Sequence, residues 1–248
     1  YIIIFRIRVF FVFVRKNHLN KLQNKYAKYA KIIVYLLIIG ERIMFNRLCK
    51  IIFIRHGSTI YNEENRLFDS EEYPPLNEAG KYEIETLTEW LKNTTPKIDC
   101  IYTSSALRAI QSARLIAKSY KTGFEILDNL YERKAGVWGG LTFDQIEEQY
   151  PQELEQYHQN PFEFWPEGGE STKELNARVK KTIGEIIDNN KYKILAVVTH
   201  AGVIQAAIAN ALDIPPKNQS RVIIRTGSAT QINYYEYGAG LIYSSYVP

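Results

Sequence analysis

The chain has 248 residues, of which 46% are hydrophobic and 23% charged, so it can bury a sizeable core as an ordinary globular protein does. Two cysteines exclude a disulfide framework, and without a cleavable signal pattern they favour a reducing, cytoplasmic setting. The net charge is +4, but residues 1–43 carry nine Lys and Arg against one acid, which leaves −4 for the remainder. This acidic body argues against nucleic acid as a partner.

Residues 1–43 differ in composition from the rest of the chain. They are rich in Ile, Phe, Tyr, Lys and Asn without a clean amphipathic period, and the apolar run 32–39 is too short to span a bilayer. One interpretation is upstream sequence translated from a wrongly assigned start, because Met44 is the single methionine and precedes the first strand. The alternatives are a membrane-surface anchor and a polybasic arm. We therefore expect one folded domain over 44–248, with membrane contact only if the extension belongs to the mature protein.

Predicted strands and helices alternate from Lys50 onward. The first strand covers about 50–55, and Asn77 is predicted to cap a helix whose apolar residues fall at helical spacing. A second strand covers 99–103, and Ser104 or Ser105 is expected to cap the next helix. The buried stripe predicted for the first helix is Ile84, Leu87 and Leu91, and for the second Ala106, Ile110, Ala113 and Ala117.

The second half of the domain continues this alternation. A short strand is predicted over 124–127, and residues 142–165 are expected to form helices broken at Pro151 and Pro161 that cover the site. Ser171 and Glu174 form a capping box for a long helix with Val179, Ile183 and Ile186 inside. The remaining predicted elements are a strand over 194–198, a helix over 202–212, and β-rich segments over 221–225 and 229–236. Near-continuous apolar strands separated by helices predict an α/β fold, a mostly parallel central sheet with helices on both faces.

Two histidine motifs stand at predicted strand ends. Arg55-His56-Gly57 follows the apolar run 51–54, and His200-Ala201-Gly202 follows the run 194–198. Ligands bind at the carboxyl ends of strands in such sheets, and glycines let a ligand approach the backbone. Arg108 lies on the first helical turn after the second strand, where backbone N–H groups favour anions. Each residue alone has an ordinary structural explanation, but together they predict a phosphate pocket.

The residues around these motifs resemble the histidine phosphatase superfamily, the phosphoglycerate mutase-like enzymes. The resemblance runs in order from about residue 48 to the end of the domain, and residues 1–43 have no counterpart in it. It implies a three-layer fold and a phosphoryl-transfer activity. The segments that carry it are Arg55-His56-Gly57-Ser58-Thr59 with Asn62, Arg66, residues 75–80, residues 103–109, Leu130-Tyr131-Glu132, residues 168–171 and residues 198–202.

The resemblance implies a role for each site residue. His56 attacks phosphorus through a neutral ring nitrogen and forms a phosphohistidine. Arg55, Arg108 and His200 hold the phosphoryl oxygens and offset their charge. Glu132 protonates the leaving oxygen and then activates water. The further substrate contacts are expected from Gly57, Ser58, Thr59, Asn62 and Ala201. No cofactor or metal is expected, because the arginines supply the positive charge and the histidines lack the spacing of a metal site.

The substrate is predicted from departures within the family. Residues 136–140 resemble the phosphatase form, and no arginine lies between Arg133 and Arg178, where mutases carry additional phosphate ligands. This favours a phosphatase acting on a small phosphorylated metabolite, similar to α-ribazole phosphatases and broad-specificity relatives. A phosphoglycerate mutase and a non-catalytic phospho-ligand-binding protein are the alternatives, and a homodimer is compatible with all three. The aromatic residues Phe162, Phe164 and Trp165 either stack on a nucleoside-like base or pack the covering segment onto the body.

Overall fold

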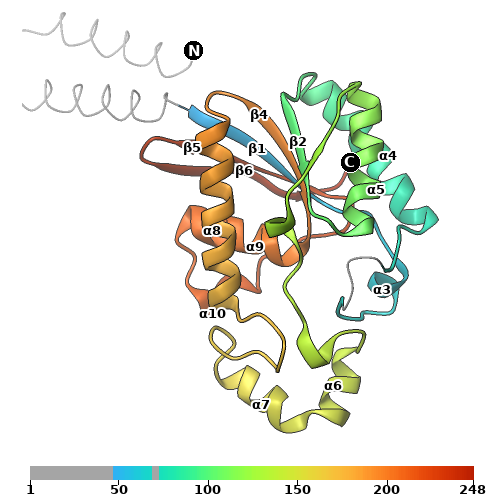
Figure 1. Cartoon of the computed structure of the whole chain (residues 1–248), viewed down its shortest axis with the longest axis vertical. Helices are drawn as coiled ribbons and strands as arrows, with labels where there is room; N and C mark the ends of the chain where they lie inside the picture. Colours follow the sequence, from blue (N-terminus) through green and yellow to red (C-terminus); the bar gives the residue numbers. More distant parts are fainter. Residues whose placement is uncertain (1–46, 69–72) are drawn as a thin grey trace, which may run out of the picture. The chain divides into compact units, whose positions relative to one another are not determined.

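A single six-stranded sheet organises the described part of the chain. The computed structural model describes residues 47–68 and 73–248 (Figure 1), and the predictions for residues 1–43 lie outside these ranges. The strand order is β3-β2-β4-β1-β5-β6, in which the first four strands pair in parallel, and β5 pairs antiparallel with β1 on one side and with β6 on the other. The strands are β1 (Arg47–Arg55), β2 (Cys100–Thr103), β3 (Glu125–Ile126), β4 (Ile194–Thr199), β5 (Ala229–Tyr235) and β6 (Gly238–Tyr246).

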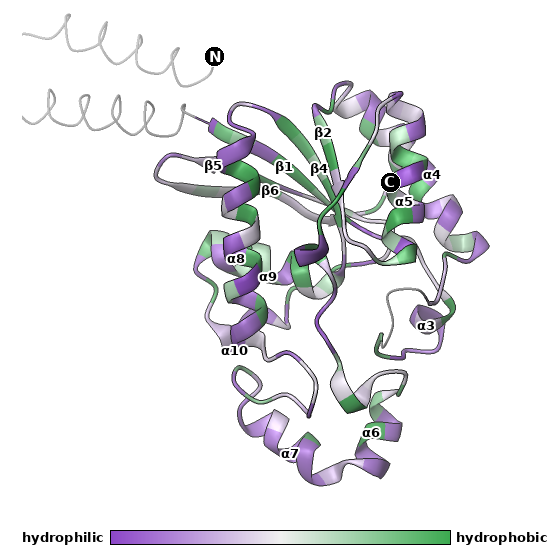
Figure 2. Ribbon diagram, in the orientation of Figure 1, coloured by the Kyte–Doolittle hydropathy of each residue, from purple (hydrophilic) through white to green (hydrophobic). Residues whose placement is uncertain are grey.

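Helices cover both faces of the sheet, as the sequence predicts. α4 (Glu78–Thr94) and α5 (Leu107–Tyr120) pack on one face, and α8 (Thr172–Asn189) and α9 (Ala201–Leu212) on the other. Alternate residues of β1 pack into the two cores on either side of the sheet. Ile52 and Ile54 face α4 and α5, whereas Ile51 and Phe53 face α8 and α9. Figure 2 shows β1 and β4 as largely hydrophobic along their length, which is expected of strands covered on both faces. Each fully buried side chain of this size contributes about 1.5–3 kcal/mol.

The predicted starts of two helices are confirmed by their hydrogen bonds. The amide of Gly80 donates to Oδ1 of Asn77 at 2.7 Å. The amide of Ser171 donates to the Glu174 carboxylate at 2.8 Å, and the amide of Glu174 donates back to Oγ of Ser171 at 3.2 Å. The apolar stripes predicted for these two helices are buried.

The start of α5 differs from the prediction. Its N-cap is Ala106, not Ser104 or Ser105, because the hydroxyl of Ser104 is engaged with His200 at 2.7 Å. Of the predicted stripe, Ala106, Ala113 and Ala117 are buried and Ile110 is half-buried, and Ala109 and Ile116 complete the buried face. Arg108 is buried as well, at 2% exposure.

The segment 221–225 is not a strand, which corrects the prediction. Turn hydrogen bonds hold its start, from the amides of Arg221 and Val222 to preceding carbonyls, and Ile224 enters the core from a loop while Ile223 is 74% exposed. The edge strand β6, by contrast, had no prediction. Its half-exposed, Gly-, Ser- and Tyr-containing sequence carries little apolar signal, and pairing with β5 holds it in the sheet.

A small additional core lies under the segment between β3 and α8. We call it the satellite cluster: Trp138, Ile146 and Leu154 are buried, and Phe164 and Trp165 pack against them. Pro151 separates the two helices of this segment, as predicted. No helix of 47–68 or 73–248 is long and apolar enough to cross a membrane. The shorter elements are α3 (Ile60–Glu63), η1 (Asp128–Leu130), η2 (Gly136–Trp138), α6 (Phe143–Gln149), α7 (Pro151–Gln159) and α10 (Pro216–Gln219).

Candidate active site

The ends of three adjacent strands bring the predicted phosphate ligands together. Arg55 pairs in register with Thr199, so the residues that follow them, His56 and His200, leave the sheet side by side. Their ring centroids lie 5.2 Å apart. β2 flanks β4 and leads into α5, whose first turn carries Arg108. Residues separated by up to 145 positions therefore meet at one edge of the sheet.

His56 is held as a neutral imidazole with one free ring nitrogen. Its Nδ1 lies 2.8 Å from the carbonyl oxygen of Gly57, which can only accept, so the proton resides on Nδ1. Its Nε2 is buried and has no hydrogen-bond partner in the described part of the chain. Burial, with the charges of Arg108 and Arg55, lowers the pKa of His56 well below the usual value. Nε2 thus presents a lone pair at neutral pH.

His200 is anchored through its other face. Its Nε2 lies 2.7 Å from Oγ of Ser104, and its Nδ1 is buried without a hydrogen-bond partner among residues 47–68 and 73–248. Burial lowers the pKa of His200 well below its usual value, and Arg108 adds to this effect. Ser104 thus orients the ring of His200, whereas the sequence predicted it only as a helix cap, because its bond spans 96 residues of sequence.

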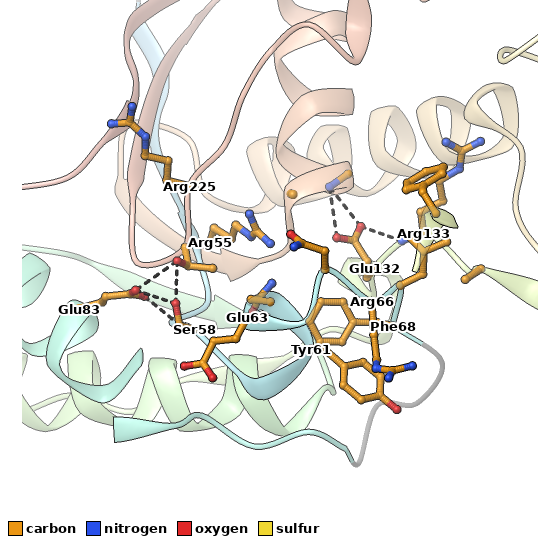
Figure 3. A pocket seen from close by; sticks show the side chains of 18 of the residues that line it. Arg55, Ser58, Tyr61, Glu63, Arg66, Phe68, Glu83, Glu132, Arg133 and Arg225 are labelled. Carbon is orange, nitrogen blue, oxygen red and sulfur yellow. Dashed lines mark hydrogen bonds between the residues drawn. The ribbon is translucent and has the colours of Figure 1, made fainter. Parts of the chain in front are cut away.

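The acid Glu132 reaches the site through a close approach to α9. Its Oε1 accepts hydrogen bonds from the amides of Arg133 at 2.8 Å and Gly202 at 3.1 Å, as Figure 3 shows. A Cβ at position 202 would lie 2.6 Å from that oxygen. Glycine is therefore required beside Ala201 for the carboxylate to sit there.

The loop after His56 is held by contacts with α4 and by hydrogen bonds within the loop itself. A Cβ at Gly57 would lie 2.1 Å from the carbonyl oxygen of Gly80, so the loop touches α4 directly. The hydroxyl of Ser58 donates to Glu83 at 2.6 Å. The amide and the hydroxyl of Thr59 donate to Oδ1 of Asn62 at 3.1 and 3.0 Å. Glu83 was not found from the sequence, because its partner Ser58 is 25 residues away and on another element.

A cavity of about 800 Å³ opens beside this cluster. Arg55, Glu132 and Ala201 line it, and Arg55 donates from Nη1 to the carbonyl oxygen of Ile224 at 2.6 Å. Gly57 and Thr59 are not among its lining residues. Further lining residues include Ser58, Asn62, Phe68, Arg133, Phe143, Trp165 and Arg225.

Arg178 ties the acid-bearing segment to α8. It forms a double hydrogen bond with Glu170, at 2.7 and 2.6 Å, with both side chains about one-tenth exposed. It also donates to the carbonyl oxygens of Asn129 and Tyr131, at 2.8 and 3.1 Å, and stacks on the Tyr131 ring. This arginine therefore fixes the backbone immediately before Glu132.

The aromatic residues of the covering segment pack against the body. The ring centroid of Trp165 lies 5.2 Å from those of Trp138 and Tyr157, and the guanidinium of Arg133 stacks on it at 3.3 Å. Phe164 joins the same satellite cluster. Burial lowers the pKa of Arg133 to about 10. Phe164 and Trp165 therefore pack the covering segment onto the body. Trp165 and Phe143 also line the cavity.

This geometry suits transfer of a phosphoryl group. It offers a neutral ring nitrogen as nucleophile, buried cations and donors for three phosphoryl oxygens, and a carboxyl group at the cavity side. Within 47–68 and 73–248, no group of three or more His, Cys, Asp and Glu is placed to hold a metal ion.

A model of the histidine phosphatase superfamily (branch 1) matches residues 51–244. The chain belongs to this superfamily. The resemblance found in the sequence is thus confirmed, and so is the fold class. The proteins to which this chain is similar include both a phosphoserine phosphatase and phosphoglycerate mutases.

Three proteins illustrate the relationship. Phosphoglycerate mutase-like protein 4 of Arabidopsis thaliana is 32% identical over 169 residues, covering 65% of this chain and 70% of that protein. Phosphoserine phosphatase 1 of Hydrogenobacter thermophilus is 27% identical over 168 residues, covering 66% and 77%. The chain spans only 39% of the fructose-2,6-bisphosphatase of Saccharomyces cerevisiae, with 24% identity over 184 residues.

The fold is also shared with solved structures. A putative α-ribazole-5′-P phosphatase from Escherichia coli superimposes with a TM-score of 0.72 over 81% of this chain and 98% of that chain. Its sequence identity is 22%, so this likeness establishes the architecture and leaves the substrate to be argued separately.

Proposed function

We propose that this chain is a phosphomonoester hydrolase that works through a phosphohistidine on His56 and needs no metal ion. The observation that carries the proposal is the tautomer of His56. Its Nδ1 proton is committed to the Gly57 carbonyl, and its buried Nε2 has no hydrogen-bond partner in the described part of the chain. A neutral imidazole with a free lone pair, close enough to Arg108 and Arg55 to feel their charges, is suited to attack phosphorus.

The first step transfers the phosphoryl group to the enzyme. Nε2 of His56 attacks phosphorus while the bond to the leaving oxygen breaks, and Glu132 gives that oxygen a proton. Arg55, Arg108 and Nδ1 of His200 donate to the phosphoryl oxygens, whose charge they offset in the transition state. The depressed pKa of His56 supports this step, because the ring stays unprotonated at neutral pH.

The second step releases phosphate. Glu132, now a carboxylate, takes a proton from water as the water oxygen attacks phosphorus, and the bond to Nε2 of His56 breaks. Both steps use the same acid–base group, which the amides of Gly202 and Arg133 hold at the cavity side. The free enzyme and inorganic phosphate result.

The proposed substrate is a small phosphorylated metabolite whose leaving group fits the 800 Å³ cavity. α-Ribazole 5′-phosphate is one candidate, supported by the sequence features of the covering segment and by the shared fold of the Escherichia coli protein. The cytoplasm is the proposed location, in keeping with two free cysteines. A phosphoglycerate mutase is the second candidate, favoured by the identity with the Arabidopsis protein.

Release of inorganic phosphate from a panel of phosphomonoesters, with EDTA present, tests the proposal. The panel should contain α-ribazole 5′-phosphate, phosphoserine and 3-phosphoglycerate. We expect hydrolysis of at least one ester and an acid-labile, base-stable phosphoryl group on His56 in a quenched reaction. A requirement for a bisphosphate primer with net isomerisation would instead identify the mutase, and strict metal dependence would contradict the metal-free mechanism.

A further inference from the structure

One aromatic ring of the cavity wall lies against two of the predicted phosphoryl-binding groups, His56 and Arg108. Phe68 lines the cavity, and its ring lies beneath the Arg108 guanidinium, with 3.8 Å between the guanidinium carbon and the ring centroid. The same ring meets His56 edge-on, with centroids 5.5 Å apart. Figure 3 shows Phe68 at the cavity wall beside Tyr61.

The groups behind this ring are closed to solvent. His56 and His200 have no exposed surface, and Arg108 is 2% exposed. None of these three is among the residues that line the cavity. A phosphoryl group that enters from the cavity therefore cannot reach Nε2 of His56 while Phe68 keeps this position.

We propose that Phe68 is a specificity-determining gate: its ring must leave Arg108 and His56 before a phosphoryl group can bind. This inference rests on the proposed function, because it assumes that the ligand approaches His56. A phosphomonoester gains contacts between its leaving group and the cavity wall, and these contacts offset the displacement of the ring. Inorganic phosphate has no such group, so the gate favours esters over free phosphate and limits inhibition by the product.

The surroundings of Phe68 leave space for this movement. The side chain is half-buried, and the adjoining cavity offers about 800 Å³. The ring of Tyr61, 5.8 Å away and tilted by 34°, supplies an apolar surface on the same side. The contact that must be broken is a cation–π stack, which is of moderate strength.

The test measures binding of inorganic phosphate by calorimetry to the wild type and to Phe68→Ala. We expect phosphate to bind about 2- to 30-fold more tightly to the variant, the range that loss of one cation–π stack allows. Phe68→Leu keeps bulk without a π-face and should bind phosphate with intermediate affinity; it also replaces the alanine variant if that one fails to fold. The matched control is Phe143→Ala, which removes a ring from the same cavity wall that does not stack on Arg108 or His56; its phosphate affinity should change less than about twofold.

A second readout is independent of affinity. Diethyl pyrocarbonate should modify His56 several-fold faster in Phe68→Ala than in the wild type, as followed by mass spectrometry of the His56 peptide, with exposed His158 as internal reference. Unchanged phosphate affinity and unchanged modification would overturn the gate. Weaker phosphate binding in both variants would also overturn it, and would make Phe68 a positioning residue for Arg108. Neither readout requires turnover, so loss of the phosphohistidine mechanism and loss of the gate are separate results.

Discussion

The two sides of the active site are supported by cores of very different size. The nucleophile side is attached to β1 and β4, whose central residues have no exposed surface and belong to the two large core clusters on either face of the sheet. The leaving-group side is attached to the satellite cluster, whose buried residues are Trp138, Ile146 and Leu154 alone. Large close-packed cores are hard to deform, whereas a small cluster with few buried contacts can adjust at modest cost.

This difference assigns chemistry to one side and selection to the other. His56 and His200 are placed by register pairing within the sheet, so their separation is fixed before any substrate arrives. Trp165 and Phe143 are placed by a few aromatic contacts. Arg178 joins the two sides, because it ties the segment before Glu132 to α8. We therefore expect substitutions at the sheet edge to affect the chemical steps, and substitutions on the leaving-group side to affect substrate recognition.

The largest effect is expected at the sheet edge. His56→Ala removes the nucleophile, and we expect phosphate release to fall by about 10⁴-fold or more, since no covalent intermediate can form. His158→Ala removes an exposed histidine of α7 and should retain activity. Substantial hydrolysis by a folded His56→Ala protein would contradict the covalent route.

The second-largest loss of turnover is expected on substitution of the proposed general acid, Glu132. Glu132→Gln keeps the size of the side chain and removes proton transfer, so turnover should fall by about 10²–10⁴-fold. The loss should be smaller for p-nitrophenyl phosphate, whose leaving oxygen needs little protonation. Glu163→Gln, an exposed carboxylate of the covering segment, is the control. Equal losses for good and poor leaving groups would argue that Glu132 does not protonate the leaving oxygen.

Substitution of Arg178 removes the contacts that join the segment before Glu132 to α8. Arg178→Met leaves the Glu170 carboxylate buried without its partner, and we expect a loss of about 3–5 kcal/mol in the free energy of unfolding. Adding Glu170→Leu should recover much of this loss, because no buried charge then remains. Lys173→Met removes an exposed ion pair instead and should change stability by less than about 1 kcal/mol. Denaturant titration measures the free energy of unfolding of the wild type, the two single variants and the double variant.

Stability should fall as the pH drops below about 6.5. Both site histidines have a folded-state pKa well below the usual value, so the unfolded chain binds protons that the folded one does not. Each histidine should then remove about 1.4 kcal/mol per pH unit, starting near the unfolded pKa of about 6.5 and continuing down to the folded pKa. His200→Asn should lose one of these two contributions, and a pH slope equal to that of the wild type would contradict burial of His200 in its neutral form.

The smallest effect is expected on the leaving-group side. Trp165→Leu removes a cavity wall and the stack on Arg133, so KM should rise about 3- to 10-fold with little change in kcat, since the transition-state groups are untouched. Trp90→Leu, in a separate aromatic group with Tyr243 and Tyr246, should leave KM unchanged. A main effect of Trp165→Leu on kcat would show that recognition and chemistry are not separated.

Some of this organisation follows from short stretches of sequence. The apolar run before His56 predicts a buried strand that ends there, and the run before His200 predicts another. Asn77 and Ser171 with Glu174 mark helix starts because capping depends on residues three positions apart. Since parallel strands end at a common edge, these local signals were enough to predict that the two histidines meet.

Other features depend on partners far along the chain. Ser104 is a residue type that often caps helices, yet its hydroxyl bonds His200 because β2 lies beside β4. The segment 221–225 has the composition of a strand, yet the fold uses only Ile224 of it to fill the core. Phe68 and Arg178 carry no local signal at all. Composition and spacing therefore determined the buried strands β1 and β4, the starts of α4 and α8 and the meeting of the two histidines, while tertiary packing decided which side chains lie next to them, since such contacts join residues that no local pattern relates.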